Sequence, residues 1–230
     1  MTTLCAYSSG CGQTPELQIL KEWQAGKSVS EQSVEHFGIA NCFQAVAIDN
    51  PIFRRIDGKS FKKECTTPRA DLRYIKVLHH DLRGQIRLGE MICHQSISEE
   101  LLEIFQTLYN AKYPIERMVL IDDYDADDQR SMVANNSSAF NFRVIAGTTK
   151  LSKHSRGMAV DINPLYNPFV KHQAGKLIVE PQEAIAYVDR KQDFPCKIDT
   201  NSLCYKEFIK HGFEWGGSWQ SCKDYQHFEK

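Results

Sequence analysis

The segment that decides how this chain is interpreted runs from Leu151 to Asp161 and has the sequence LSKHSRGMAVD. From Gly157 onward its pattern predicts a strand, and alternate side chains of a strand face opposite sides. Val160 then packs toward a core, whereas Asp161 faces away from it. His154 lies just before the strand, and the glycine lets the chain turn so that the imidazole approaches the carboxylate. An imidazole and a carboxylate are both zinc ligands, but two ligands alone do not make a tight site.

The C-terminal end of the chain offers a third ligand. His227 lies three positions after Asp224, and both follow an aromatic and glycine-rich run, FEWGGSW, at 213–219. A catalytic zinc ion takes three protein ligands and leaves its fourth position to water, whereas structural zinc normally has four ligands. A free carboxylate beside that water completes a hydrolytic site. This pattern makes His154, Asp161 and His227 candidate ligands, with Asp224 as the candidate base.

Each of these residues also has an ordinary structural explanation. A single histidine is more often a surface or core residue than a metal ligand. The remaining histidines are assigned to that ordinary class: His36, His79, His80, His94, His172 and His211. Trp215 and Trp219 fit equally well as walls of a cleft and as core aromatics. The acidic run at 122–128 lacks the glycine and the terminal glutamate of an EF-hand loop, so we expect a solvated turn there.

Composition excludes several classes of function. The 230 residues include 28 basic and 29 acidic side chains, for a net charge of -1, and no long basic stretch favours nucleic acid or an anionic membrane. The longest apolar runs, 45–48 and 118–121, are too short to cross a bilayer. Eight cysteines without a C-x-x-C pair argue against a cysteine zinc ribbon or a thioredoxin-type site. The bulk numbers therefore indicate a globular protein with one substantial core.

The other elements follow from caps, turns and periodicity. We expect a helix capped by Thr14 and ending at Gly26, followed by a hairpin of strands 72–80 and 85–93. A second helix should start at a Ser96–Glu99 capping box, carry an apolar stripe to Leu108 and stop at Tyr113-Pro114. A buried strand at 118–121, a strand at 157–162 and a helix at 202–211 complete the predicted elements. Residues 27–68 are expected to wrap on the main domain, and 164–196 to be irregular. Because no βαβ rhythm appears, the predicted class is α+β.

The motifs Ser-x-His-x-x-Gly-x-Ala-x-Asp, Trp-Gly-Gly-x-Trp and Asp-x-x-His, in this order, resemble the zinc D,D-peptidase family. That family includes D-alanyl-D-alanine carboxypeptidases and dipeptidases and L-alanyl-D-glutamate endolysins, and its fold is shared with the hedgehog signalling domain. The resemblance extends upstream through 147–149 and 141–143, and more loosely to the hairpin near Leu72. The two motif regions together are more specific than either one alone.

The resemblance implies a role for each matching residue. His154, Asp161 and His227 take the zinc ligand positions, and Asp224 takes that of the catalytic base. Arg143 matches an arginine that binds the substrate and stabilises the oxyanion; Ser152, by the same resemblance, contacts the substrate backbone. Many carboxypeptidase and dipeptidase members have glutamate at the base position, whereas the endolysin-like branch has aspartate. Asp224 therefore favours the endopeptidase branch, without separating it firmly from a carboxypeptidase.

The resulting hypothesis is an α+β zinc metallopeptidase, with a small antiparallel sheet flanked by helices and Zn²⁺ as cofactor. Residues 1–68 would form an extension on a catalytic domain at 69–230. The implied partners are peptidoglycan stem peptides, and we expect an exported monomer, periplasmic or cell-wall associated, whose leader is not present in this chain. A non-catalytic zinc-binding module of the same fold is the alternative. Another zinc hydrolase that merely shares the ligand set is a second rival.

Overall fold

The computed structural model describes residues 14–145 and 147–230. Its helices are α1 (Pro15–Glu22), α2 (Glu31–Phe37), α3 (Asn50–Ile56), α4 (Gln95–Asn110), α5 (Asp128–Val133) and α6 (Leu203–Lys210). Its strands are β1 (Ser28–Val29), β2 (Gln44–Ala47), β3 (Leu72–His80), β4 (Ile86–His94), β5 (Ala159–Asp161), β6 (Phe169–Gln173), β7 (Lys176–Glu180), β8 (Glu214–Trp215), β9 (Lys223–Asp224) and β10 (His227–Glu229). Short 3₁₀ turns, among them η4 (Lys153–Arg156), connect them. The mixture of helices with small antiparallel sheets agrees with the predicted α+β class.

The largest sheet has four antiparallel strands in the order β1-β4-β3-β2. Its centre is the predicted hairpin, in which Leu72 pairs with His94 and His80 with Ile86. The turn between the strands is closed by Asp81, whose carboxylate accepts two backbone N–H groups at 2.9 Å each. An aspartate that bonds the backbone just ahead of it is an efficient turn former. The hairpin prediction is confirmed.

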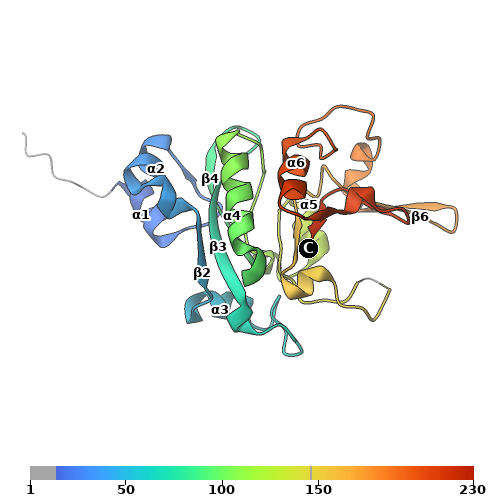
Figure 1. The fold of residues 1–230 in the computed structure, drawn as a ribbon, viewed down its shortest axis with the longest axis horizontal. Coiled ribbons are helices and arrows are strands. Elements are labelled where there is room, and N and C mark those ends of the chain that lie inside the picture. The colour runs from blue at the N-terminus through green and yellow to red at the C-terminus, as the bar shows by residue number, and fades with distance from the viewer. Residues whose placement is uncertain (1–13, 146) are drawn as a thin grey trace, which may run out of the picture.

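The two faces of this sheet are buried against different parts of the chain. Alternate residues such as Ile75 and Met91 pack with the apolar stripe of α4, whereas Tyr74 and Ile92 pack with residues from α1 to α3. Figure 1 shows α4 in front of the sheet and the N-terminal helices at its far side. Because both faces are covered, β3 and β4 carry buried apolar residues on both faces.

One ion pair, between a buried carboxylate and a partly exposed arginine, attaches the N-terminal segment to this sheet. Glu90 on β4 is fully buried, and Arg55 on α3 donates two hydrogen bonds to it at 2.7 and 2.5 Å. The hydroxyl of Tyr74 on β3 donates a third to the same carboxylate. The hydrogen bonds with Glu90 raise the pKa of Arg55, so the arginine stays charged. Burial, together with the charge of Glu90, raises the pKa of Tyr74, so the phenol stays protonated. Hydrogen bonds from two elements, α3 and β3, therefore stabilise the charge of the buried Glu90 carboxylate.

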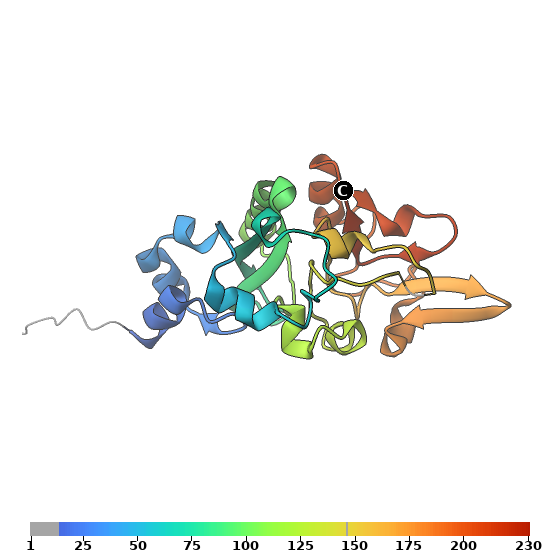
Figure 2. The same cartoon turned by 90° about the horizontal axis from the view of Figure 1, so that it is seen from below.

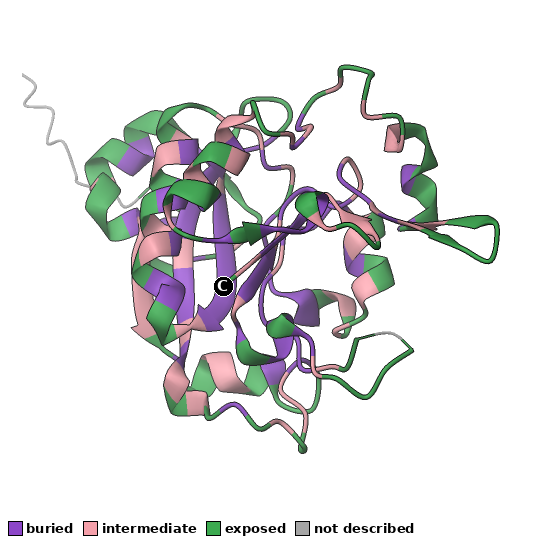
Figure 3. Cartoon of the chain, turned by 45° about the vertical axis from the view of Figure 1, so that its right-hand side comes forward, coloured by how far each residue is buried: buried purple, intermediate pink, exposed green. Residues whose placement is uncertain are grey.

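Two three-stranded sheets form the C-terminal part, in the orders β5-β10-β8 and β7-β6-β9. The inner side of the first carries Val160 and Phe228, which join the core built around α4 and α6. The second sheet ends in the β6–β7 hairpin, which projects from the body of the molecule in the view of Figure 2. Figure 3 shows that the hairpin tip is exposed while the sheet strands are buried.

Several local predictions were wrong. Residues 118–121 are buried but form no strand. The side chain of Asn136 takes the place of a neighbouring strand, because it bonds both the N–H and the C=O of Val119. The cap of α4 is His94, not Ser96. The stretch 164–196 contains the β6–β7 hairpin and is not wholly irregular.

The acidic run is a solvated turn only in part: Asp123, Asp125 and Asp127 are exposed, but other carboxylates of the run are not. Asp122 is 3% exposed and accepts hydrogen bonds from the backbone N–H and hydroxyl of Ser60 at 2.9 Å each. Asp127 caps α5, and Asp128 pairs with Arg143. These carboxylates tie the loops around α5 together. No helix in the described residues is long and apolar enough to span a membrane.

We predict that Arg55→Ala lowers the free energy of unfolding by about 3 kcal/mol, because it leaves the carboxylate of Glu90 buried without its ion-pair partner. Arg54→Ala is the matched control, since Arg54 is an exposed residue of the same helix. Its expected effect is within about 0.5 kcal/mol. Urea denaturation followed by circular dichroism measures both. Equal effects of the two substitutions would contradict the importance of the buried pair.

Candidate metal centre

Two of the predicted ligands form a cross-strand pair. Asp161 is the last residue of β5, and His227 is the first residue of β10, directly opposite it. Residues opposed in an antiparallel pair have their Cβ atoms about 5 Å apart and on the same face of the sheet. The inner neighbours Val160 and Phe228 anchor this pair in the core, so strand pairing alone brings Asp161 and His227 together.

The third predicted ligand comes from the turn before β5. His154 lies in η4, which begins after Ser152 and ends at Gly157 in the left-handed conformation (φ 66°). The carbonyl of Gly157 accepts the N–H of His94 on β4, and a Cβ added at position 157 would lie 2.6 Å from that nitrogen. Only glycine allows both the backbone conformation and this close approach. The turn therefore holds His154 over the end of β5.

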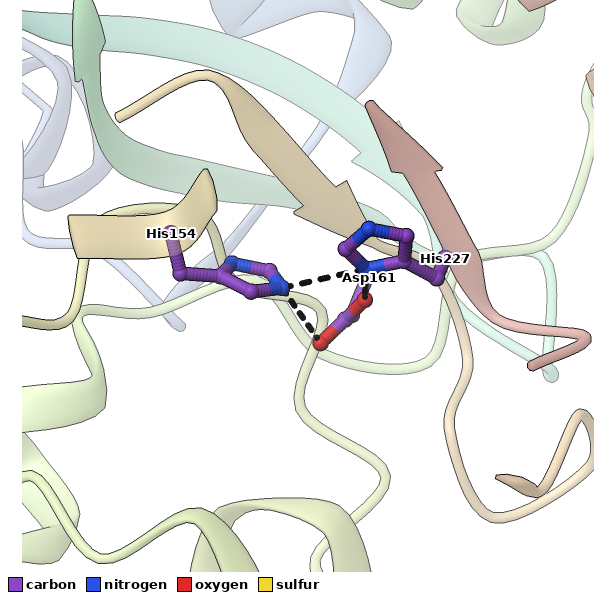
Figure 4. A group of neighbouring side chains, drawn as sticks. All are labelled: His154, Asp161 and His227. Carbon is purple, nitrogen blue, oxygen red and sulfur yellow. Dashed lines mark hydrogen bonds and ion pairs between the residues drawn. The ribbon is translucent and has the colours of Figure 1, made fainter. Parts of the chain in front are cut away.

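Figure 4 shows the three side chains pointing at one another from their separate elements. His154 Nε2 lies 3.2 Å from Asp161 Oδ2 and 3.2 Å from His227 Nδ1. His227 Nδ1 lies 3.0 Å from Asp161 Oδ1. Both imidazoles are about 95% buried, so the cluster lies mostly out of contact with bulk water.

The other nitrogen of each imidazole determines what this cluster can hold. The second nitrogen of His154, Nδ1, lies 2.6 Å from the carbonyl of Ala139, which can only accept, so Nδ1 carries the proton. His227 Nε2 lies 3.0 Å from the carboxylate of Glu229 and donates to it. Two imidazole lone pairs and one carboxylate thus converge. Three electron-rich atoms at such distances require a cation between them, and these residue types are ligands for a divalent metal.

Without the metal, a proton takes its place. Burial works against a charged imidazole at His227, but hydrogen bonds with Asp161 and Glu229 outweigh it and raise the pKa of His227 to about 10. Burial likewise works against a charged Asp161, yet the facing imidazoles hold its pKa well below the usual range. The cluster thus stabilises positive charge at its centre.

The predicted base lies beside this cluster, in the other small sheet. A Cβ added at Gly216 would lie 2.8 Å from the Cβ of Asp224 and 3.3 Å from that of His227, so the two side chains flank this glycine. The carboxyl of Asp224 is buried, and its Oδ1 has no hydrogen-bond partner among the described residues. Burial raises the pKa of Asp224 to about 6. A buried carboxyl oxygen without a partner is suited to accept a proton from a water held in the cluster.

The two other predicted site residues have identifiable contacts. The hydroxyl of Ser152 accepts the backbone N–H of His154 at 3.2 Å and so caps η4. Arg143 pairs through its Nε with Asp128, and its backbone N–H donates to Ser155 at 2.9 Å. Both residues are thus fixed to the turn that carries His154. Their contacts with a substrate remain predictions.

The tryptophans have different surroundings. Trp215 is a core residue whose indole N–H donates to the carbonyl of Tyr225 at 2.9 Å. The ring of Trp219 lies with its centroid 5.3 Å from that of His227. The tryptophan at 219 therefore covers one side of the metal cluster, whereas the one at 215 supports the chain between Asp224 and His227.

Sequence reasoning missed Glu229. Positions 227 and 229 of β10 face the same side, and the residue opposite Glu229 on β5 is Ala159, whose small side chain leaves room for the carboxylate to reach His227. Carboxylates that accept from the outer nitrogen of a ligating histidine fix its tautomer and orientation. The spacing His-x-Glu at the start of a strand was the signal that could have identified it.

Metal uptake by this cluster is expected to release a proton. At pH 7 His227 is protonated in the metal-free protein, since its pKa is raised to about 10, and only the neutral imidazole binds metal. Zinc affinity should therefore increase about tenfold per pH unit between about pH 7 and about pH 9. Calorimetric zinc titrations in buffers of different ionisation enthalpy count the released proton. An affinity that does not change with pH would remove His227 from the ligand set.

Glu229→Gln should weaken zinc binding about 10- to 100-fold while the fold is retained. The amide is isosteric but uncharged, and its NH₂ group can favour the wrong tautomer of His227. Glu214→Gln is the matched control, because Glu214 is the exposed neighbour of Glu229 on β8. Competition with a chromophoric chelator measures the affinity. Equal affinities in the two variants would show that Glu229 does not act on the metal site.

Comparison with known proteins agrees with the arrangement. Residues 146–230 match the family model described as D-alanyl-D-alanine carboxypeptidase, and this segment contains the three converging residues and Asp224. Neither the curated proteins nor the solved structures give a match. The resemblance drawn from the sequence motifs is therefore confirmed over residues 146–230, the segment that is similar to the D-alanyl-D-alanine carboxypeptidase family of peptidases.

Proposed function

We propose that this protein is a zinc peptidase that hydrolyses amide bonds in peptidoglycan stem peptides, either as a D-alanyl-D-alanine carboxypeptidase or as an L-alanyl-D-glutamate endopeptidase. The observation that carries the proposal is the buried, unpartnered carboxyl oxygen of Asp224 beside three converging ligand atoms. A structural metal site has no use for such a group, because its carboxylates serve as ligands or are hydrogen-bonded.

The ligand atoms suit zinc in number, type and spacing. Zinc bonds to nitrogen and carboxylate oxygen are about 2.0–2.2 Å long, so the corners of a tetrahedral site lie about 3.3 Å apart. The separations of 3.0 to 3.2 Å between His154, Asp161 and His227 agree with this value. Three protein ligands leave one position for water, as in catalytic sites. Zinc, when bound there, would polarise the scissile carbonyl and make its water acidic enough to react near neutral pH.

Asp224 would act as the base in this reaction. Its carboxyl takes the proton of the attacking water and passes it to the leaving amine, which is the general acid–base exchange that amide hydrolysis requires. Burial places its pKa at about 6, so the group is mostly ionised at neutral pH and still able to give the proton back. Aspartate at this position favours the endopeptidase reaction.

Arg143 would bind a negative charge of the substrate. Its Nε is used by the ion pair with Asp128, and neither terminal nitrogen is hydrogen-bonded within the described part of the chain. These two nitrogens can give parallel hydrogen bonds to a carboxylate or to the tetrahedral oxyanion, which a lysine cannot reproduce. Ser152 would contact the substrate backbone while it caps the turn carrying His154.

The remaining assignments extend the same proposal. Residues 69–230 would form the catalytic domain, of the hedgehog/D,D-peptidase type, and residues 1–68 an extension on it, with β1 and β2 added to its main sheet. A peptidoglycan substrate implies an exported protein, and we expect a monomer that binds no nucleic acid. These statements rest on the family match and on the near-neutral charge.

The test is hydrolysis of purified muropeptides by the zinc-loaded protein, followed by mass spectrometry of the products. Release of D-alanine identifies a carboxypeptidase, and cleavage after L-alanine an endopeptidase. Asp224→Asn should lower kcat about 100- to 10,000-fold, because it removes the proton acceptor. The same variant should keep its zinc, since Asp224 is not one of the three ligands.

The controls separate the possible outcomes. Removal of zinc by a chelator should abolish the activity, and added zinc should restore it. A wild-type protein that holds zinc tightly and cleaves no muropeptide would favour the non-catalytic binding module. Cleavage of ordinary peptides in place of muropeptides would indicate a different zinc hydrolase, and full activity in Asp224→Asn would contradict the role of the base.

A further inference from the structure

The β6–β7 hairpin continues the strand that carries Asp224. Strand β9 pairs with β6 in antiparallel register, with Asp224 opposite Phe169 and Lys223 opposite Val170. Beyond this pairing the hairpin extends away from the body of the molecule (Figures 1 and 2). It is thus a direct extension of the sheet in which the base lies.

The register assigns each hairpin residue to one of two faces. Because side chains alternate along a strand and opposed residues share a face, Phe169 lies on the same face as Asp224, and so does Lys171 two positions further along β6. On β7 that face carries Ile178 opposite Lys171, and Lys176 nearer the tip. The opposite face carries Val170, His172, Leu177, Val179 and Lys223.

The face shared with Asp224 is positively charged beyond its base. Lys171 and Lys176 form no ion pair within the described part of the chain, while Glu180 stands at the base opposite Phe169. This charge belongs to a wider pattern, because between positions 135 and 179 the sequence has six lysines and arginines and a single acidic residue, Asp161. The whole chain, by contrast, has a net charge of -1. The stretch of chain that leads from the turn of His154 into the hairpin is therefore richer in cations than the chain as a whole.

We propose that this face of the hairpin is a substrate-binding surface on which Lys171 and Lys176 bind carboxylates of the peptide outside the cleaved bond. The inference rests on the proposed peptidase function. Strands advance about 3.3 Å per residue, so Lys171 lies about 7 Å and Lys176 about 13 Å beyond the position opposite Asp224. An extended peptide advances by a similar amount per residue. Phe169, opposite Asp224, and Ile178, opposite Lys171, supply apolar contacts on the same face.

The chemistry of the face selects this class of ligand over others. Two separated ammonium groups with apolar residues beside them match an acidic peptide. A nucleic acid would need a denser row of cations and several stacking aromatics, whereas this face has two lysines and a single phenylalanine, Phe169. The surface therefore predicts a preference for stem peptides whose internal carboxylates are free over those in which they are amidated.

Two synthetic stem peptides of identical sequence test the inference, one with free and one with amidated internal carboxylates. The wild-type, zinc-loaded protein should cleave the free form with the higher kcat/KM. Lys171→Gln should lower kcat/KM for the free form about fivefold, mainly through KM, and leave the amidated form unchanged. Lys171→Arg should restore much of the preference, and salt from about 0.05 M to about 0.5 M should weaken it.

Lys223→Gln is the matched control, because Lys223 directly precedes Asp224 on β9 and lies on the opposite face of the same sheet. It should leave the preference as in the wild type. Equal cleavage of both peptides by the wild type, or equal losses in Lys171→Gln and Lys223→Gln, would overturn the role of the hairpin while the peptidase proposal stands. No cleavage of either peptide by any variant would instead refute the peptidase function, and this inference with it.

Discussion

The functional site depends on the convergence of two imidazole lone pairs and one carboxylate. The outer nitrogen of each imidazole donates a hydrogen bond, in His154 to the carbonyl of Ala139 and in His227 to the carboxylate of Glu229. In the neutral rings the inner nitrogens can therefore only accept. With Asp161 between them, the cluster has a deficit of positive charge in a mostly buried place. A divalent cation would balance the negative charge and the lone pairs of this cluster. In its absence a proton on His227 does so. The elements that carry the three residues, η4, β5 and β10, must therefore keep fixed positions relative to one another.

Strand pairing explains how these three electron-rich ligand atoms are held close together. The core residues beneath the ligands, Val160 and Phe228, are fully buried, and their packing fixes β5 against β10 before any metal is considered. Gly157 adds the third ligand by letting the preceding turn approach β4 closely. Apolar burial thus supplies the energy that positions charged groups, because burial of large side chains stabilises by a few kcal/mol each while an uncompensated polar cluster costs a similar amount.

The parts of the fold and of the site that could be predicted are those marked by a motif of fixed spacing along the sequence. The residues around His154 and around His227 form motifs with fixed internal spacing, and the hairpin β3–β4 has strong alternation with a turn at Asp81. The β6–β7 hairpin was missed because its turn uses Ala174 at φ 51° before Gly175, whereas the usual residue there is asparagine or aspartate. The role of Glu229 was missed because it depends on which residues of two paired strands share a face.

The division of the site between two small sheets has a mechanical consequence. His227 belongs to the sheet of β5, β10 and β8, whereas Asp224 belongs to the sheet formed with the projecting hairpin. Tyr225 and Gln226 separate the two residues along the chain. Under the proposed mechanism, a change in the tilt of the hairpin would move Asp224 relative to His154, Asp161 and His227 and leave these three residues where they are. Such a movement would alter the rate of hydrolysis and leave the affinity for the ion unchanged.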